Sequence, residues 1–492
     1  MKRSLLAALA AAPLALTNPI LAEQGAEIPL PDSRPGRVYA EFLRHCDTAD
    51  TGALKDWYET ALGEAAAKRF PADNRVEIQL ALCRDNGGFA VGGIEEDKPD
   101  SLRVRLRGKN SGEWMLGGTS TEADGKIDRE ILLTPTQPPE SALPKDLGDQ
   151  AIAALLADRV AKLGAAGKFS GIAAIARGPD LIATASAGFA DRKKKTPITP
   201  DTQFTLASLG KMFTATAVGQ LVDQGKLSFD DKVGRIFPDY PNKTVRDKVT
   251  LGMLMSHTSG MGDFLEKRTP AMMKHGIKRA TELMPLYDKD EPAFEPGSKW
   301  AYSNAGLALM GAIVEKRSGQ SYADYIRHHV FAPAGMTQSD PNNIPRRPKS
   351  LVVPYTRMKM DGTPLPDWQE AERDIGSPAG GAISTVRDLA RFAEALRSGK
   401  LISRKTFALM ATNHNPTSTG GMGYGYAMMI DDVYGTPVLG HGGGFPGVNT
   451  RLAFLPDSPY SVIVLANQDY PAADSLVTLP IAEIVEKTKT GQ

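Results

Sequence analysis

The chain has 492 residues, a length typical of two or three domains. Of these residues 41% are hydrophobic and 23% are charged, a composition typical of a globular protein. Its 58 lysines and arginines are balanced by 57 aspartates and glutamates. This balance provides no overall attraction to nucleic acid or to anionic membranes, so we expect neither as a partner.

The N-terminal residues MKRSLLAALAAAPLALTNPILAEQ contain two basic residues, an apolar run and a plausible cleavage site before Glu23. This order is typical of a secretory signal peptide, which we place at residues 1–22. The alternative is an uncleaved membrane anchor, but Pro13, Pro19 and the short apolar core argue against it. We therefore expect a periplasmic or secreted protein with no membrane span after signal cleavage.

Residues 23–135 predict a small α+β domain of unknown role. GRVYAEFLRHC and TGALKDWYETALGEAAAKRF have helical spacing, whereas LRVRLRG, GEWMLGGTS and KIDREILLTP alternate as strands do. VEIQLALC also alternates and predicts a strand that ends at Cys83. Cys46 and Cys83 could form a disulfide in an oxidising compartment, and two separately buried thiols are the alternative.

Residues 136–148, TQPPESALPKDLG, are proline-rich and polar and predict a linker to a larger domain at 149–492. That domain begins with a helix, AIAALLADRVAKLGAAG, and two strands that turn at Gly178–Asp180. A mostly helical stretch follows from about 204 to 400, and then come the strands GYGYAMMID, TPVLGHGG, TRLAFLP and YSVIVLANQ and a terminal helix. Strands at both ends of the domain predict one antiparallel sheet flanked by helices, with a helical lobe inserted.

Ser208 and Lys211 are the first candidates for chemistry. Residues three apart share one face of a helix, so the amine can reach the hydroxyl. A serine is a weak nucleophile until a base activates it, and lysine serves as a base only when burial or nearby positive charge lowers its pKa. The alternative is a pair of ordinary polar residues at the start of a helix.

Two further motifs follow in the chain. Tyr302 and Asn304, in KWAYSNAGLALMG, stand just before a predicted helix, and their alternative role is a packing tyrosine with a helix N-cap. His441 precedes three glycines in LGHGGGFPG, where the backbone N–H of Gly444 could face a substrate oxygen. The alternative there is a tight glycine turn with an incidental histidine.

The order Ser-x-x-Lys, Tyr-x-Asn and His-Gly-Gly resembles the serine β-lactamase and penicillin-binding protein superfamily. The closest branch looks like the class C β-lactamases and their esterase, D-aminopeptidase and DD-peptidase relatives. FTLASLGKMFTATAVGQLVDQGKLSFDDKV, VTLGMLMSHTSGMGDF and PAGGAISTVRDLARFAEAL match the branch as well. The resemblance covers about residues 150 to 485 and does not cover 25 to 148.

The resemblance implies that Ser208 is the nucleophile and Lys211 its base partner. Tyr302 would share in proton transfer, Asn304 would orient Lys211 and a substrate amide, and the N–H groups of Ser208 and Gly444 would form the oxyanion hole. No cofactor or metal is implied. The expected fold is α+β: a β-lactamase/transpeptidase-like domain preceded by the small α+β domain.

His441 marks a departure, because it stands where β-lactamases and many penicillin-binding proteins carry the lysine of Lys-Thr-Gly. Loss of that ammonium weakens the site for a β-lactam or a peptide carboxylate. We therefore expect an exported serine hydrolase that cleaves an ester or a D-amino-acid amide through an acyl-enzyme. The alternatives are a catalytically idle protein that binds peptidoglycan fragments or a partner, and a weak β-lactamase. Neither the substrate nor the oligomeric state follows from the sequence.

The remaining candidate residues have simpler interpretations. His257, in SHTSG, is expected to be structural, and His328 and His329 lie on a predicted helix without a third metal ligand. No Gly-x-Ser-x-Gly motif occurs, which excludes an α/β-hydrolase nucleophile elbow, and neither a zinc motif nor a phosphate loop is found.

Overall fold

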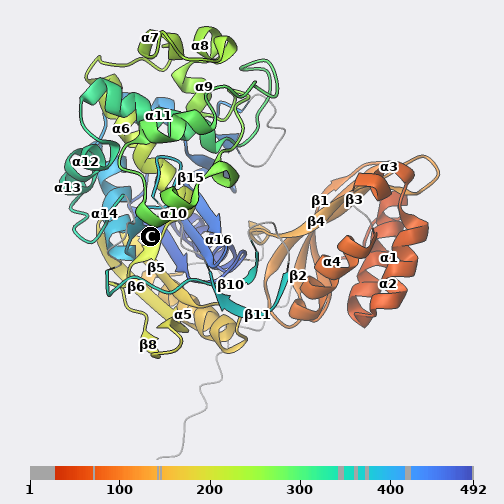
Figure 1. Cartoon of the computed structure of the whole chain (residues 1–492). Helices are drawn as coiled ribbons and strands as arrows, with labels where there is room; N and C mark the ends of the chain where they lie inside the picture. The colour runs from red at the N-terminus through yellow and green to blue at the C-terminus, as the bar shows by residue number, and fades with distance from the viewer. Residues whose placement is uncertain are drawn as a thin grey trace, which may run out of the picture. The chain divides into compact units, whose positions relative to one another are not determined.

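The computed structural model describes residues 28–69, 72–140, 143, 147–341, 348–359, 364–371, 376–415 and 423–489. The chain divides into two compact units, Met1–Thr134 and Pro135–Gln492 (Figure 1). The expected signal peptide lies outside the described residues. Within them, no helix combines the length and the apolar character that a membrane crossing requires.

The first unit packs helices against one face of an antiparallel sheet whose strand order, β1-β2-β3-β4, follows the chain. Its buried side chains, such as Tyr58 from a helix and Leu102 and Val104 from β2, form one hydrophobic core. The predicted strands LRVRLRG and GEWMLGGTS form an antiparallel hairpin, since β2 and β3 pair with Arg107 opposite Trp114. The elements are α1 (Arg34–Thr48), α2 (Thr51–Ala61), α3 (Glu64–Arg69), α4 (Ala72–Asn86), β1 (Phe89–Asp97), β2 (Ser101–Gly108), β3 (Trp114–Thr121) and β4 (Ile127–Pro135).

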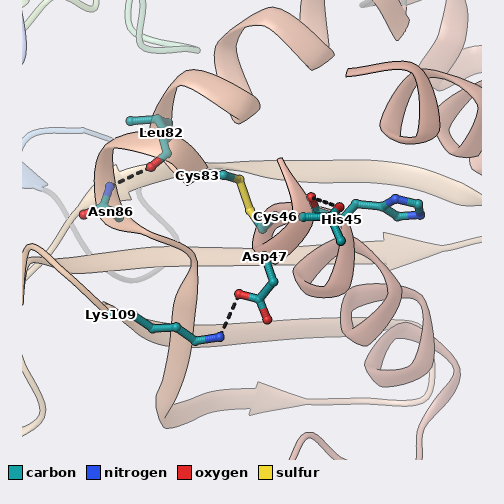
Figure 2. The surroundings of a disulfide bond; sticks show 8 residues. His45, Cys46, Asp47, Leu82, Cys83, Asn86 and Lys109 are labelled. Atoms are coloured by element: carbon teal, nitrogen blue, oxygen red, sulfur yellow. Dashed lines mark hydrogen bonds and ion pairs between the residues drawn. A yellow bond between two sulfur atoms is a disulfide. The ribbon is translucent and has the colours of Figure 1, made fainter. Parts of the chain in front are cut away.

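The prediction of a strand ending at Cys83 is wrong, because this segment belongs to helix α4. Val76, Leu80 and Cys83 are buried, and their spacing of four and three residues places them on one face of a helix. The short alternating pattern fitted both periods, and packing against the core selected the helix. Figure 2 shows Cys83 joined to Cys46 of α1 in a disulfide, with the two Cα atoms 5.1 Å apart.

The second unit is built on a seven-stranded sheet with the order β13-β14-β15-β16-β17-β5-β6. The prediction that strands from both ends of this domain share one antiparallel sheet is confirmed, since β17 pairs with β5 antiparallel. Its strands are β5 (Gly171–Arg177), β6 (Asp180–Ala187), β13 (Gly423–Tyr424), β14 (Met429–Val433), β15 (Thr436–Phe445), β16 (Val448–Phe454) and β17 (Tyr460–Ala466).

Helices cover both faces of this sheet. On β5, Ala173 and Ile175 belong to a core shared with α5 (Asp149–Ala165) and α16 (Asp474–Lys489). Ile172 and Ala174 instead face a larger core that contains most of the helical lobe. The main helices of that lobe are α6 (Lys211–Asp223), α7 (Val233–Ile236), α8 (Lys243–Lys248), α9 (Leu251–Met255), α10 (Pro270–His275), α11 (Asn304–Ser318), α12 (Tyr322–Tyr325), α13 (Ala332–Ala334), α14 (Val386–Arg397) and α15 (Arg404–Met410).

Shorter elements complete the second unit. They are β7 (Phe189–Asp191), β8 (Thr196–Pro197), β9 (Phe204–Thr205), β10 (Tyr355–Met358), β11 (Pro364–Glu370), β12 (Ile383–Ser384), the 3₁₀ turns η3 (Ala207–Gly210), η4 (Leu265–Lys267) and η5 (Ala280–Leu286), and the π-helical turn η6 (Ile326–Phe331).

The expected linker is described only in part, and that part lies against the second unit. The Gln137 side chain donates to the carbonyl of Asp432 at 3.3 Å, and the Tyr434 hydroxyl donates to the carbonyl of Pro138 at 2.6 Å. Leu143 is buried in the core that includes α5 and α16. These described residues therefore belong structurally to the second unit.

Candidate active site

Ser208 lies in the 3₁₀ turn η3, immediately before helix α6. The residue before it, Ala207, has a φ of 47°, a conformation that costs free energy for a residue with a Cβ. Its carbonyl accepts a hydrogen bond from the N–H of Gly381 at 3.0 Å, and the Thr450 hydroxyl donates to the carbonyl of Leu206 at 2.8 Å. The turn that carries Ser208 is therefore held between two neighbouring segments.

Gly380 lets one of those segments approach the turn closely. A Cβ on Gly380 would lie 2.6 Å from the carbonyl oxygen of Ala207 and 3.1 Å from the backbone nitrogen of Ser208. Its φ of 145° is also a conformation that side chains disfavour. A glycine is therefore required for this contact.

Lys211, the first residue of α6, is fully buried. Its Nζ lies 3.0 Å from Ser208 Oγ, 2.7 Å from Asn304 Oδ1 and 2.5 Å from the carbonyl oxygen of Ala379. Asn304 Oδ1 and the Ala379 carbonyl can only accept hydrogen bonds, so each takes an N–H of the amine. Its third N–H points at Ser208 Oγ, so loss of that proton would leave the lone pair of the amine directed at the serine hydroxyl.

Asn304 is the first residue of α11, and Ser303 rather than Asn304 is the N-cap, since its hydroxyl accepts from the N–H of Gly306. The Asn304 side chain is consequently free to turn toward the site. Its Nδ2 donates to Asp263 Oδ2 at 2.6 Å, which fixes the amide with Oδ1 toward Lys211. Asp263, an exposed residue, thus sets the orientation of a group that contacts the lysine.

Tyr302 precedes that N-cap and is 38% exposed. Its ring centroid lies 4.8 Å from Lys211 Nζ. Burial of the phenol raises the pKa of Tyr302 above its usual range, and the Asp263 carboxylate raises it further, whereas a hydrogen bond with Ser208 acts in the opposite direction. The phenol is therefore protonated at neutral pH.

Strand β15 carries His441 and Gly444 along the same site. A Cβ on Gly443 would lie 2.1 Å from the carbonyl oxygen of Leu206, so the strand packs directly on the turn that holds Ser208. The pairing of β14 with β15 ends at Gly440, and among the described residues no strand pairs with the following part of β15 on that side. Gly444 lies in this unpaired stretch, and a Cβ there would meet open space.

His441 is buried and both of its ring nitrogens are occupied. Nε2 lies 2.9 Å from the Tyr424 hydroxyl, and Nδ1 lies 2.5 Å from the carbonyl oxygen of Gly442. Burial and the neighbouring charge of Lys211 lower the pKa of His441 to about 3. The imidazole is therefore neutral at physiological pH and is not a substitute for the lysine of Lys-Thr-Gly as a cation.

Arg451 is a charged side chain on the neighbouring strand, opposite Gly442 in the β15–β16 register. Its guanidinium lies 3.3 Å from where a Gly442 Cβ would be, and it forms an ion pair with Asp431 at 2.8 Å. The absence of a side chain at Gly442 therefore leaves room for Arg451, whose charge is matched by a carboxylate.

The structure thus brings Ser208, Lys211, Tyr302 and Asn304 into one group and places Gly444 on the adjoining strand, while the His441 ring points into a buried network. Sequence reasoning missed three contributors, Ala379, Asp263 and Tyr424. The carbonyl of Ala379 has no sequence signal, because every residue carries one. Asp263 is the last residue of the SHTSGMGD segment, which matches the family without indicating a role for its aspartate, and Tyr424 lies in a glycine-rich segment that has no motif of its own. Among the described residues, no group of three His, Cys, Asp or Glu side chains is arranged to hold a metal ion.

Comparison with known proteins points to one family. A family model described as Beta-lactamase matches residues 153–485. Penicillin-binding protein 4* of Bacillus subtilis (strain 168) is 31% identical over 334 residues, which cover 65% of this chain and 73% of that protein. Esterase EstB of Burkholderia gladioli is 30% identical over 356 residues, covering 64% of this chain and 90% of that protein.

A solved structure, D-amino acid amidase from Ochrobactrum anthropi SV3 complexed with D-phenylalanine, matches with a TM-score of 0.59 at 25% identity. The match covers 70% of this chain and 99% of that one. The family model spans the β5–β17 sheet, the turn at Ser208, the start of α11 and strand β15. The chain therefore belongs to the beta-lactamase family of serine hydrolases.

Proposed function

We propose that this protein is an exported serine hydrolase that cleaves esters or D-amino-acid amides through an acyl-enzyme on Ser208. The observation that carries the proposal is the placement of Lys211 Nζ, 3.0 Å from Ser208 Oγ and bonded to two acceptors, Asn304 Oδ1 and the Ala379 carbonyl. This arrangement fits a base that takes the proton of a nucleophile.

In the first step, Ser208 Oγ attacks the substrate carbonyl carbon while its proton passes to Lys211. Two N–H groups of the amine stay on their acceptors, so the lysine receives the proton without changing position. The charged lysine then lies 2.7 Å from Asn304 Oδ1, whose orientation the Asp263 carboxylate maintains. A nearby negative charge and two fixed acceptors stabilise the ammonium that forms.

The tetrahedral intermediate then loses its alcohol or amine. Tyr302 is suited to donate the proton that the leaving group requires, because its phenol is protonated and its ring lies beside Lys211, the partner of Ser208. Lys211, with Nζ 4.8 Å from the ring centroid, is positioned to stabilise the charge that develops on Tyr302. Water then attacks the acyl-enzyme, with the same groups acting in reverse.

The negatively charged oxygen of the intermediate needs hydrogen-bond donors beside the unpaired edge of β15. The N–H groups of Ser208 and Gly444 are the proposed pair. Each such donor contributes on the order of 2.7–4 kcal/mol to transition-state stabilisation. The packing of Gly443 on the Leu206 carbonyl sets the distance between the strand and the turn, and thereby between the two donors.

The neutral His441 and the absent side chain at Gly442 favour esters and amides over β-lactams. A β-lactam carboxylate would need a free cation or a hydroxyl beside β15, whereas His441 is uncharged and Arg451 is paired with Asp431. The similarity to an esterase and to a D-amino acid amidase supports the same preference. Weak β-lactamase activity is the second outcome that the substrate panel below addresses.

Export is supported by two separate features. The first 22 residues have the order of charges and apolar residues found in signal peptides. Cys46 and Cys83 form a disulfide, and disulfides persist mainly in oxidising compartments. Mass spectrometry of the mature N-terminus after fractionation tests the proposal, and an intact Met1 on cytoplasmic protein would overturn it.

The decisive experiment compares p-nitrophenyl esters, D-alanyl p-nitroanilide and nitrocefin as substrates for the wild type and Ser208→Ala. We expect ester or D-amino-anilide turnover to exceed nitrocefin turnover, and Ser208→Ala to abolish all three. Ser398→Ala is the matched control, because Ser398 is an exposed serine of the same unit at the end of α14.

A fluorophosphonate probe provides a second readout. It should label the wild type and Ser398→Ala but not Ser208→Ala. Label retained on Ser208→Ala would refute the assignment of the nucleophile. Saturable binding without turnover of any substrate would instead support a catalytically idle protein.

A further inference from the structure

Three buried aromatic side chains, His257, Tyr424 and His441, connect the backbone of Ser303, which follows Tyr302, to the backbone of Gly442 on β15. The Ser303 N–H lies 3.1 Å from His257 Nδ1, and His257 Nε2 lies 2.9 Å from the Tyr424 hydroxyl. That hydroxyl lies 2.9 Å from His441 Nε2, and His441 Nδ1 lies 2.5 Å from the Gly442 carbonyl. The three side chains are at most 3% exposed.

The two backbone groups at the ends of this series of hydrogen bonds fix the direction of every hydrogen bond in it. A backbone N–H can only donate, so His257 Nδ1 accepts from Ser303 and its proton is on Nε2. His257 therefore donates to the Tyr424 oxygen. At the other end, the Gly442 carbonyl can only accept, so His441 carries its proton on Nδ1 and its Nε2 accepts from the Tyr424 O–H.

One arrangement therefore satisfies all the groups, with two neutral histidines of opposite tautomer on either side of a tyrosine. Burial and the charge of Lys211 lower the pKa of both histidines below the usual value, consistent with neutral rings. A lysine at position 441 would offer three donors and no acceptor, and would leave the Tyr424 hydroxyl without its partner. A lysine at position 441 is therefore incompatible with this arrangement of hydrogen bonds.

Each end of this series of hydrogen bonds adjoins a proposed catalytic group. Ser303 follows Tyr302 directly, and the His257 ring centroid lies 4.3 Å from that of Tyr302. Gly442 lies on β15 two residues before Gly444. The backbone of His257 is itself held, since its carbonyl accepts from the N–H of Ala301 at 2.9 Å. The series of hydrogen bonds thus runs from the neighbour of Tyr302, the proposed acid, to β15, the strand that carries the proposed oxyanion donor Gly444.

We propose that His257, Tyr424 and His441 act as one positioning unit that sets the Tyr302 phenol and the Gly444 N–H at a fixed separation across Ser208. The proposal rests on the hydrolase function proposed above. None of the three side chains is assigned a contact with the reacting atoms. Their effect is on the rate of the chemical step rather than on substrate binding.

The kinetic test removes one atom from the middle of the unit. Tyr424→Phe keeps the ring and deletes the hydroxyl, and we expect kcat for a p-nitrophenyl ester to fall between about 10- and 100-fold, with KM within about twofold. Tyr426→Phe is the matched control, because Tyr426 contacts Phe229 and His414 and has no hydrogen bond to the unit. Wild-type kcat in Tyr424→Phe would overturn the proposal.

A pair of substitutions at position 441 tests the need for an acceptor. His441→Gln can still accept the Tyr424 proton through its amide oxygen, whereas His441→Met has similar size and is a poor acceptor. We expect His441→Gln to keep more of the wild-type kcat than His441→Met, at equal melting temperature. Equal losses in both variants would contradict the proposed role.

The spectroscopic test does not depend on turnover. NMR of the full chain with ¹⁵N-labelled histidine reports which ring nitrogen carries the proton, and His441→Gln identifies the signals of residue 441. At pH 7 we expect His257 protonated on Nε2 and His441 on Nδ1, with both signals shifted in Tyr424→Phe. A charged ring or the reverse tautomers would overturn the positioning unit. Persistence of ester turnover in Ser208→Ala would instead refute only the hydrolase proposal.

Discussion

The two units of the molecule are built on opposite plans. In the first unit the strand order β1-β2-β3-β4 follows the chain, and one disulfide joins α1 to α4 through two cysteines that are 37 residues apart in sequence. In the second unit, β17 lies between β16 and β5, two strands that are separated by most of the domain. Local pairing organises the first unit, and pairing between distant segments organises the second.

This difference coincides with the distribution of chemically active groups. Each partner of Lys211 comes from another part of the second unit: Ser208 from η3, Asn304 from the start of α11, and the Ala379 carbonyl from the segment before β12. A site of this kind requires segments that converge from distant positions. In the described part of the first unit we find no comparable group of side chains.

The comparison of the two units predicts that the largest loss of turnover follows a change at Lys211, where these segments meet. Lys211→Ala removes the proposed base and leaves two buried acceptors without their donor, so we expect kcat for ester hydrolysis to fall on the order of 10³-fold or more. Steady-state kinetics checks this, with Lys226→Ala, an exposed lysine that closely follows α6, as control. Turnover within tenfold of the wild type would remove Lys211 from the mechanism.

Loss of the disulfide should change the stability of the first unit only. Replacement of Cys46 and Cys83 by serine should lower the free energy of unfolding of the first unit by about 2–4 kcal/mol. Ester turnover should be unchanged, since Ser208 and its partners all belong to the second unit. Calorimetry of both proteins, together with their kcat values, measures the two effects. A parallel loss of activity would show that the units are coupled.

A smaller effect is expected where β15 meets the turn at Ser208. In Gly443→Ala the new Cβ would collide with the Leu206 carbonyl, so the strand must move away from Ser208, the proposed nucleophile. We expect kcat/KM to fall between about 10- and 100-fold, because small misplacements of catalytic groups are costly. Gly148→Ala, at the N-cap of α5 with no atom within 4 Å of its added Cβ, should behave as wild type. Equal activity of both variants would show that the strand has room to adjust.

The effect that is smallest near neutral pH is the response of the second unit to acid. His441 has a lowered pKa in the folded protein, so below pH 6.5 the unfolded chain takes up a proton that the folded ring refuses. The stability of the second unit should therefore fall as the pH drops from about 6.5 toward 3, by at most about 1.4 kcal/mol per pH unit for this histidine.

Urea unfolding at several pH values measures that slope. His441→Gln should make the slope shallower, whereas His275→Gln, a substitution of an exposed histidine in α10, should not. An unchanged slope in His441→Gln would mean that the folded ring takes up its proton in the ordinary range.

Much of the fold and the grouping of the main candidate residues were predictable because they follow from local patterns. The sheet strands and the terminal helix alternate or repeat with clear periods, and Ser208, Lys211, Tyr302 and Asn304 belong to recognisable motifs. The helix that carries Cys83 was not predictable, since eight residues fit both periods and only the surrounding core decides between them.

The environment of His441 was also beyond the sequence. Its motif position indicated a place beside Ser208, but the direction of its ring depends on Tyr424, which lies 17 residues earlier on another strand. Likewise, the partners of Lys211 include a backbone carbonyl, and backbone groups have no residue-specific signal. Three-dimensional packing supplies this part of the site.

The unpaired edge of β15 contains three consecutive glycines, Gly442 to Gly444. A wall of this kind presents backbone groups and no side chains to a ligand, and its Gly442 carbonyl already accepts from His441 Nδ1. It can grip the main-chain amide of an acyl group, but it has little means of distinguishing one acyl substituent from another. We therefore expect the proposed hydrolase to be unselective toward the acyl group along β15, and differences in selectivity among its substrates to depend on other segments.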